Sequence, residues 1–597
     1  MMSKFIFAFL FWLLLPQLVE AREAVRTIID IQGFSKSSSM STYGGGKAFF
    51  IKLNKNIERW YLLRVKWPRS KEFFHFHLEN PYPDELRVTV AANRRKLSIT
   101  DGALVEECDL LSRAGRQALW EALKVKKPYA EVCNGRLYLR SSVKGSMSTK
   151  EAAVDFTRDH VWGGETVISA IKDTIYKDAE LITTEVTLDE SGQASNFSLN
   201  GPKNADLSRR FLKARSIPGD LAIAAASEDD GTMAIGKWYA ADNLDDAYVS
   251  LVQPQAIKKK ILSSHPLRVL PLDRVESTAV VYLVAFDLSQ IEVGYSVGTE
   301  HPKLTYSERT SDRLKVQGWP GPDGVSDYEP LASTGRLSPR DAKRVLATFT
   351  GGFKRKHSVF RAGGRSTGNG GNHYGFLQNG VLFSTIHAGL ATAYADKNGS
   401  FGMKTWRKED NKKLGDLVFA RQNGLPLVYK DRRGNSVPGK LVRHNFKGNW
   451  SGSKQNTIRA LRSGICLQTN ESGTKFLIFG YFSSHTPNGM ARVFQSYDCD
   501  YAIHLDMNMV VHTYLAVYHT KIGKPIQVEH LLEKMHWKDR KFNDQSIPRF
   551  VAVPDNRDFF YLLRQPKKSS RAQAKKDMID AGSPESVAAS RSSKVSR

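Results

Sequence analysis

The sequence is short of cysteine, of acidic residues and of long apolar runs. It holds four Cys among 597 residues, and 61 Asp and Glu stand against 87 Lys and Arg, which gives a formal net charge of +26. So few Cys exclude a small disulfide-stapled scaffold, and Gly and Pro without a three-residue period exclude a collagen. With 41% hydrophobic residues the composition is that of a folded protein. Because single cores stop growing at roughly 250–300 residues, we expect more than one domain.

Several common motifs are also missing. No Cys-x-x-Cys is present to suggest a zinc site. Residues 44–47 resemble part of a P-loop but lack its leading Gly and its Ser or Thr. His75 and His77 would share one face of a strand without a third metal ligand nearby. No cofactor is predicted, and the sequence leaves a divalent metal open.

The most apolar run lies at the start of the chain. Lys4 precedes the apolar residues 5–15, and Val19-Glu20-Ala21 offers a cleavage site, a pattern typical of a signal peptide. The alternative is a membrane anchor, but the run is shorter than the roughly 20 residues that a spanning helix needs. The sequence therefore predicts a signal peptide over residues 1–21 and a secreted or periplasmic mature protein.

Export to an oxidising compartment would let the four cysteines pair. Cys108 and Cys133 lie in the first half of the chain, and Cys466 and Cys499 in the second. Four cysteines allow three connectivities. We favour pairing within each half, since each short loop so closed contributes about 3–4 kcal/mol in the chain-entropy model.

The mature chain shows two patterns that predict two domains. Residues 22–264 alternate strand-like runs with turns and helical stretches, and a charged, proline-bounded linker follows over residues 265–277. A nearly continuous apolar run over residues 279–288, typical of a strand buried on both faces, opens a second domain over residues 278–556. We expect an α+β fold in which the C-terminal domain has a mixed β-sheet core with flanking helices.

Further elements follow from periodicity and from turn residues. Helices are expected over residues 112–125, 148–160, 163–177, 338–346 and 488–497, and strands over residues 347–349 and 501–505. Residues 565–597 hold eight basic and three acidic residues with almost no apolar ones. Such a composition predicts a disordered basic tail.

Glycine-rich turns form the first group of candidate site residues. Thr350-Gly351-Gly352-Phe353 follows an expected strand, and a glycine-dense segment with His373 comes after it. Glycines let backbone N–H groups approach an anion such as phosphate. The alternative is a flexible surface connection, which tolerates Gly for its conformational freedom alone.

Basic and amide side chains form the second group. Arg421-Gln422-Asn423 ends a strand-like run and suits a charged, hydroxylated ligand, although a polar turn is the alternative. Arg462 precedes residues 463–467, another expected strand, and a guanidinium there suits bidentate contacts to phosphate. A surface ion pair is the alternative for this arginine.

A carboxylate at the end of an apolar strand forms the third group. Residues 501–505 lead into Asp506-Met507-Asn508, and a sheet holds such polar residues rigidly at a cleft. Asp506 suits an acid, a base or a nucleophile, whereas the alternative is that Asp506 and Asn508 stabilise the next turn. His373 and His504 are candidate proton carriers, although a lone His is more often structural.

In order and spacing these groups resemble the phosphodiester glycosidase family, from about residue 280 to residue 553. The chain differs from the usual family pattern at Thr350, where Asn is common, at Lys354, and at Met507-Asn508, where Gly-Gly is common. The matching marks are Phe286-Asp287-Leu288, residues 347–353, Gly375-Phe376, Gln378-Asn379-Gly380, Arg421-Gln422-Asn423, Arg462-Ser463 and Leu505-Asp506-Met507-Asn508.

The resemblance implies a hydrolase that acts on a sugar-1-phosphodiester in an envelope or extracellular glycan. Its transition state is oxocarbenium-like, and the leaving phosphate needs cations or N–H donors. The implied catalytic residues are Asp506, Arg462 and Asn508, and the implied phosphate- or substrate-binding residues are Gly351, Gly352, Arg421, Gln422, Asn423 and His373. The alternative is a non-catalytic envelope module that binds anionic glycan.

The net positive charge predicts the chemistry of the partners. Outside the cytoplasm its counterparts are anionic lipids, phosphate-bearing polymers and acidic glycans. We expect an anionic glycan or a phosphate-linked sugar as substrate, membrane-surface contact through the basic tail, and no nucleic acid.

Overall fold

The computed structural model describes residues 25–27, 36–54, 57–124, 128–141, 153, 177–188, 201–227, 230–244, 246–299, 333–353, 375–444, 459–519, 526–542 and 545–565. The predicted signal peptide, the predicted tail beyond residue 565, and His373 lie outside these residues. So do the expected helices 148–160 and 163–177, apart from residues 153 and 177. Strands dominate the described part and helices are few, so the predicted α+β class is confirmed.

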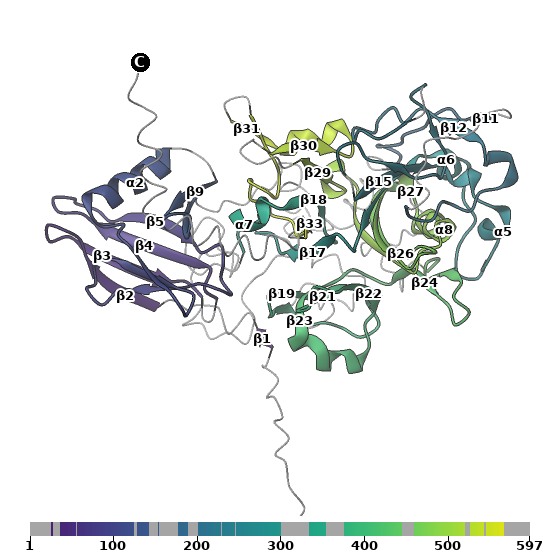
Figure 1. Ribbon diagram of the computed structural model, residues 1–597. Helices are drawn as coiled ribbons and strands as arrows, with labels where there is room; N and C mark the ends of the chain where they lie inside the picture. The colour runs from purple at the N-terminus through teal and green to yellow at the C-terminus, as the bar shows by residue number, and fades with distance from the viewer. Residues whose placement is uncertain are drawn as a thin grey trace, which may run out of the picture.

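Among the described residues 36–141, the N-terminal part holds two antiparallel sheets and helix α2 (Arg113–Lys124) (Figure 1). The expected helix 112–125 is α2, whose Leu119 belongs to the same buried cluster as side chains of both sheets. The Cys108–Cys133 disulfide, with Cα atoms 5.3 Å apart, joins β8 to the end of β9. The strands, in sheet order, are β2 (Lys36–Ser41), β3 (Lys47–Lys52), β4 (Trp60–Lys66), β5 (Phe74–Glu79), β10 (Leu137–Arg140) and β9 (Tyr129–Val132), and then β6 (Arg87–Val90), β7 (Leu97–Thr100) and β8 (Val105–Cys108).

An eight-stranded and a five-stranded sheet pack face to face in the larger part of the molecule. Phe349 and Phe479 meet between them with ring centroids 5.4 Å apart. The first sheet holds β14 (Tyr239–Ala240), β15 (Ala247–Val252), β16 (Val281–Asp287), β27 (Lys475–His485), β26 (Ala460–Thr469), β28 (Tyr501–Met507), β24 (Pro426–Lys430) and β25 (Ser436–Pro438). The second holds β17 (Ile291–Ser296), β33 (Phe559–Arg564), β18 (Val345–Thr350), β29 (Leu515–His519) and β30 (Gln527–His530).

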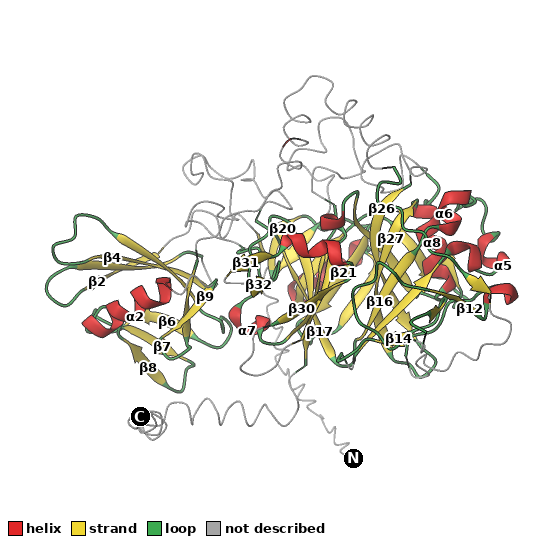
Figure 2. Cartoon of the chain, turned by 90° about the horizontal axis from the view of Figure 1, so that it is seen from above, coloured by secondary structure: helices red, strands yellow, loops and turns green. Residues whose placement is uncertain are grey.

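Helix α8 (Pro487–Ser496) covers the outer face of the eight-stranded sheet. Gly464 in β26 leaves room for it, since a Cβ there would lie 3.0 Å from Met490 and Phe494 of the helix. The Cys466–Cys499 disulfide links β26 to the turn before β28, with Cα atoms 5.9 Å apart. Both disulfides match the favoured pairing. In Figure 2 the N-terminal sheets with α2 lie at one end of the molecule, and α5, α6 and α8 lie at the other.

A six-stranded sheet and several short elements complete the described part. The sheet holds β1 (Arg26–Thr27), β20 (Val381–Ser384), β19 (Phe376–Gln378), β23 (Leu417–Gln422), β21 (Ala391–Asp396) and β22 (Phe401–Thr405). The short strands are β11 (Thr187–Leu188), β12 (Ala214–Ser216), β13 (Met233–Ala234), β31 (Arg540–Phe542) and β32 (Gln545–Ile547). The short helices are η2 (Arg209–Phe211), η3 (Pro254–Ala256), α5 (Lys259–Leu262), α6 (Arg274–Thr278), α7 (Pro339–Ala342), η7 (Lys408–Asp416), η8 (Val510–His512) and η9 (Glu533–Lys538).

The sheets extend past the expected domain boundaries on both sides. Strands β14 and β15 precede the expected linker 265–277, yet β15 pairs with β16 along its whole length. Most of α6 lies inside that linker. Strand β33 follows the expected end at residue 556 and is an inner strand of the five-stranded sheet. The boundaries at residues 264, 278 and 556 therefore do not coincide with the boundaries of the sheets.

The expected helix 338–346 is only half helical. Ser338 caps α7 by accepting a hydrogen bond from the Asp341 N–H, and Pro339 begins the helix as predicted. From Val345 the chain joins β18, which pairs with β33 and β29 on its two sides. Pairing on both sides outweighs the local helical pattern. In the described part of the chain, no helix has the length and apolar character needed to cross a membrane.

Candidate active site

The termini of three neighbouring inner strands lie together at one end of the eight-stranded sheet. Strands β27 and β28 both run antiparallel to β26, so their carboxyl ends lie beside the start of β26. At this end, Arg462 of β26 lies directly opposite Met507 of β28. The turn after β18 lies at the same end of the sheet: the Asp506 N–H donates to the Gly351 carbonyl at 3.2 Å. The sequence placed these residues in one site, and the structure brings them together.

Asp506 is joined to a guanidinium and an imidazole. Its Oδ1 accepts from the Met507 N–H at 2.9 Å, and its Oδ2 accepts from Arg557 Nη1. Arg557 Nη2 lies 2.8 Å from His512 Nε2, and His512 Nδ1 lies 2.9 Å from the Met507 carbonyl. Because a carbonyl only accepts, Nδ1 donates and Nε2 accepts from Arg557, which fixes the neutral tautomer of His512. Asp506 and Arg557 are buried and His512 is half-buried, so the imidazole lies outermost.

Arg462 is fully enclosed next to this group. Its Nε donates to the His485 carbonyl at 2.8 Å, and its Nη1 donates to His504 Nε2 at 3.1 Å and to Met507 Sδ at 3.3 Å. Burial lowers the pKa of Arg462 to about 9, an effect that the charge of Glu276 opposes. Burial and the Arg462 charge also hold the pKa of His504 well below its usual value. His504 is therefore a buried acceptor for Arg462, which does not favour its predicted role as a proton carrier.

Arg421 holds the turn after β18 instead of facing outward. It is 1% exposed, and its Nε donates to Asp558 Oδ2 at 2.7 Å. Nη2 donates to the Phe353 carbonyl at 3.0 Å, and Nη1 donates to the Gln422 carbonyl. The guanidinium also lies 4.3 Å above the Phe376 ring. All three nitrogens bind the protein itself, so this geometry favours a structural role over the predicted contact with phosphate.

The two glycines of the turn serve close packing. The Gly351 N–H donates to the Asp558 carbonyl at 2.8 Å, and the Gly352 N–H makes a long contact of 3.4 Å to Asp558 Oδ2. A Cβ on Gly351 would lie 2.2 Å from Asp558 Oδ2, and one on Gly352 would lie 2.5 Å from Asn423 Cγ. Glycine is needed at both positions because neighbouring side chains lie too close to the backbone for a Cβ atom. This close packing explains the two glycines without the predicted binding of an anion by their N–H groups.

The amides beside Arg421 also face inward. Asn423 Oδ1 accepts from the Phe353 N–H at 3.0 Å, and Asn423 Nδ2 donates to the Leu505 carbonyl at 3.4 Å. Gln422 Oε1 accepts from the His387 N–H at 2.7 Å, and Gln422 Nε2 donates to the His387 carbonyl at 2.8 Å. Both side chains fix the loops around the site and were predicted to bind substrate. Asn508 is half-buried, with a backbone φ of 79° that Asn tolerates well.

Three residues of this group, Arg557, His512 and Asp558, were not predicted from the sequence. Residues 555–558 are Asp-Asn-Arg-Asp, and each is at most 3% exposed. Their position directly before the apolar strand β33 was the available indication, because polar residues next to an inner strand are held at the end of a sheet. The expected domain end at residue 556 divided this run. Within the ranges that the structure describes, no three His, Cys, Asp or Glu side chains gather as a metal site would require.

Comparisons with known proteins found only weak structural similarities. No family model and no curated protein matches the chain. Among solved structures, it is similar to the zebrafish N-acetylglucosamine-1-phosphodiester alpha-N-acetylglucosaminidase catalytic domain auto-inhibited by its pro-peptide, at 12% identity and a TM-score of 0.27, over 71% of this chain and 96% of that one. It is also similar to a Burkholderia pseudomallei protein described as exported, at 11% identity and a TM-score of 0.21, over 48% and 74% of the two chains. Both TM-scores are too low to support an argument about fold or activity. The proposal for the function therefore rests on the geometry described above.

Proposed function

We propose that the protein is an exported hydrolase that cleaves a sugar-1-phosphodiester and uses Asp506 as its carboxylate. The linked group of Asp506, Arg557 and His512 carries this proposal. Glycoside cleavage uses a carboxylate near the anomeric carbon, and a departing phosphate is stabilised by cations. The linked group supplies a carboxylate and a cation side by side at a sheet end. The two disulfides support export, since disulfides persist in oxidising compartments.

The proposed roles follow from position. Asp506 acts at the anomeric carbon, Arg557 and the neighbouring Arg462 supply positive charge for the phosphate, and His512 orients Arg557 from the outer side. Water adds its oxygen to the anomeric carbon while the carbon–oxygen bond to phosphate breaks. The remaining proton goes to the phosphate, so the products are a free sugar and a phosphomonoester. Asn508, half-buried beside this group, is the proposed contact for a sugar hydroxyl.

Replacing the carboxylate tests the proposal. We expect Asp506→Asn to lower kcat/KM on a soluble sugar-1-phosphodiester by at least about 100-fold, the lower end of the effect of losing an acid, base or nucleophile. Arg557→Lys keeps the charge but loses the two-sided contact, so its loss should be intermediate. Asp101→Asn, at an exposed loop of the N-terminal part, makes the same chemical change and should keep full activity.

Two results would contradict the hydrolase. One is folded protein that releases no sugar from any member of a panel of sugar-1-phosphodiesters, and the other is an Asp506→Asn variant as active as the wild type. If the protein instead bound anionic glycan without turnover, and Asp506→Asn and Arg557→Lys weakened that binding, the non-catalytic module would replace the enzyme.

A further inference from the structure

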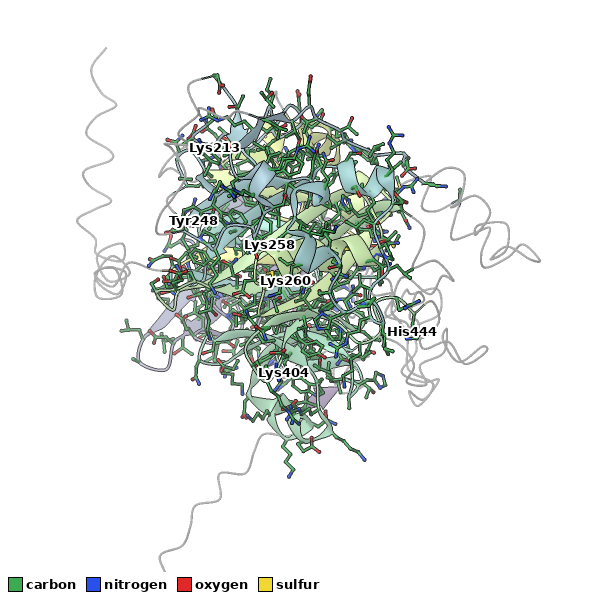
Figure 3. The ribbon with its side chains drawn as sticks, turned by 90° about the vertical axis from the view of Figure 1, so that its right-hand side faces the viewer. Lys213, Tyr248, Lys258, Lys260, Lys404 and His444 are labelled. Atoms are coloured by element: carbon green, nitrogen blue, oxygen red, sulfur yellow. A yellow bond between two sulfur atoms is a disulfide. The ribbon has the colours of Figure 1, made fainter. Side chains whose placement is uncertain are left out.

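One end of the molecule carries three basic segments, which we call the basic end: residues 203–213, 258–268 and 430–443. Together they hold thirteen basic and only two acidic residues. Figure 1 places them at the right-hand end, with β12, α5 and β24. Figure 3 looks onto this end, where Lys213, Lys258 and Lys260 are labelled on the side that faces the viewer. The basic residues of these three segments therefore lie at one end of the molecule.

Contacts between the segments make them one continuous surface. Lys258 Nζ pairs with Asp206 Oδ1 at 3.2 Å, which joins the first two segments. The Arg443 N–H donates to the Arg268 carbonyl at 2.9 Å, which joins the second and the third. Asp498, between the first and the third, is paired with both Lys203 and Lys430.

Most of the basic side chains here point into solvent. The exposed ones are Arg209, Arg210, Lys213, Lys258, Lys259, Lys260, Arg432, Arg433 and Lys440. Of the two carboxylates, Asp206 is paired with Lys258, and Asp431 accepts the N–H groups of Arg433 and Asn435 in its own turn. The excess of cations over carboxylates gives this face a positive potential, which suits an anionic partner.

Two exposed leucines stand among these charges. Leu267 is 80% exposed next to Arg268, and Leu212 is 51% exposed between Arg210 and Lys213. Apolar side chains surrounded by cations match the boundary between lipid headgroups and acyl chains. A soluble polyanion would be bound by the charges alone and would leave both leucines in water. The leucines therefore favour a lipid surface over a polymer.

The loop that carries Leu267 is held firmly from behind. Buried Arg492 of α8 donates to the Ile261 carbonyl at 2.7 Å and to the Ser264 carbonyl at 2.6 Å. Arg443 Nη1 donates to the Pro266 carbonyl at 2.8 Å. These contacts fix the loop on both sides of its tip, so the exposure of Leu267 is built into the fold.

We propose that the basic end is a docking surface for an anionic lipid bilayer. Its lysines and arginines contact the headgroup phosphates, and Leu212 and Leu267 enter the headgroup layer. This surface is separate from the predicted contact through the basic tail, and it does not depend on the proposed hydrolase activity.

Vesicle binding by the full chain tests the proposal. At physiological salt, the wild type should sediment with phosphatidylcholine vesicles that contain about one-third phosphatidylglycerol and not with pure phosphatidylcholine. Lys259→Glu/Lys260→Glu should weaken that binding by at least about tenfold, and Leu267→Ser by about threefold or more. The control Lys47→Glu/Lys71→Glu makes the same change in net charge on exposed lysines of the N-terminal part and should bind as the wild type does. The tail is present in every variant.

The outcomes separate docking from general attraction. If the control pair weakened binding as much as the Lys259/Lys260 pair, net charge alone would explain it and the docking surface would be wrong. If Leu267→Ser bound anionic vesicles as tightly as the wild type, and soluble polyphosphate displaced both equally, the face would be a polyanion site. Turnover of a soluble sugar-1-phosphodiester should be the same in all of these variants, so a failure here is distinct from a failure of the hydrolase.

Discussion

Glu276 is a residue of α6 whose buried carboxyl contacts Thr486, the N-cap of helix α8. It is 2% exposed, and its Oε1 accepts the Thr486 N–H and the Thr486 hydroxyl, both at 2.7 Å. Burial raises the pKa of Glu276 to about 7, although the two hydrogen bonds from Thr486 act in the opposite direction. The folded protein therefore holds a proton on Glu276 at pH values where the unfolded chain has lost it.

This difference predicts a loss of stability as the pH rises. Between pH 4.5 and about 7 the folded state binds more protons than the unfolded state, so the free energy of unfolding falls with pH. The shift corresponds to about 3 kcal/mol at most. In Glu276→Gln this part of the pH dependence should vanish, as measured by urea unfolding from pH 4.5 to pH 8.

The matched control is Glu107→Gln, at an exposed glutamate paired with Lys96. It should keep the pH dependence of the wild type. Equal slopes for wild type and Glu276→Gln would show that Glu276 does not titrate in this range in the folded protein.

At the residue scale, the sequence could name members of the site but not their partners. Arg421 binds Asp558, which lies 137 positions away, and Asp506 binds Arg557, which lies 51 positions away. Residue type and local pattern contain no information about such distant pairs. The structure brings Asp506 and Arg462 to the same end of the sheet, as expected, and their role in a site stays a prediction. The inward-facing contacts of Arg421, Gln422 and Asn423 were missed.

The turn between β18 and residue 353 is the element that holds the site together. Arg421, Asn423 and Asp558 each contact its backbone. We expect Gly352→Ala to lower the free energy of unfolding by about 1–3 kcal/mol, because overpacking forces shifts in buried neighbours. The new Cβ would lie 2.5 Å from Asn423 Cγ and 2.7 Å from Arg421 Nη2. Denaturant unfolding measures the change.

Gly219→Ala is the matched control for that substitution. A Cβ at Gly219 meets nothing within 4 Å. The change should be neutral or slightly stabilising, since Ala restricts the unfolded chain more than Gly does. If both variants lost the same stability, crowding at the turn would not be the cause.

At the element scale, the sequence predicted strands and helices best where burial is uniform. The apolar run 279–288 became β16, and residues 488–497 became α8 with a shift of one residue. The predicted helix 338–346 was wrong in its second half, because Val345 and the residues after it form a strand that pairs with β33 and β29. Sheet pairing is a tertiary effect that a local period does not contain.

At the scale of the whole molecule, the N-terminal sheets meet the rest through a buried polar contact. Arg336 is 4% exposed; it donates to the Tyr129 hydroxyl at 3.2 Å and to Ser141 Oγ at 3.0 Å, and it lies 4.4 Å above the Tyr129 ring. Tyr129 in turn donates to the Leu337 carbonyl at 3.2 Å. Glu79 is enclosed nearby, and burial raises its pKa although Arg59, Arg140 and Arg336 oppose that shift.

The division of the chain into domains stays a prediction, and the buried clusters of the described residues bear on it. Length alone predicts more than one core, and a separate buried cluster does occupy the N-terminal sheets. The larger cluster runs from Ile182 to Leu563. It crosses the charged segment 265–277 because β15 and β16 pair on either side of it. A polar, proline-rich segment marks a surface loop, and such a loop can connect two strands of one sheet as well as two domains.

Arg336 should determine how firmly the N-terminal sheets are attached. Arg336→Met keeps most of the side-chain volume but removes the hydrogen bonds to Tyr129 and Ser141 and one of the cations near Glu79. Removing one partner of a buried polar group costs about 1–3 kcal/mol per group left unsatisfied. We expect faster hydrogen exchange in β9 and β10 and unchanged exchange in β26 and β27. Arg340→Met is the control, because the 32% exposed Arg340 pairs mainly with its own neighbour Asp341 at 3.1 Å and reaches Glu85 of the N-terminal part only at 3.9 Å, and such surface pairs contribute little. Equal exchange in β9 and β10 for both variants would mean that Arg336 does not hold the two parts together.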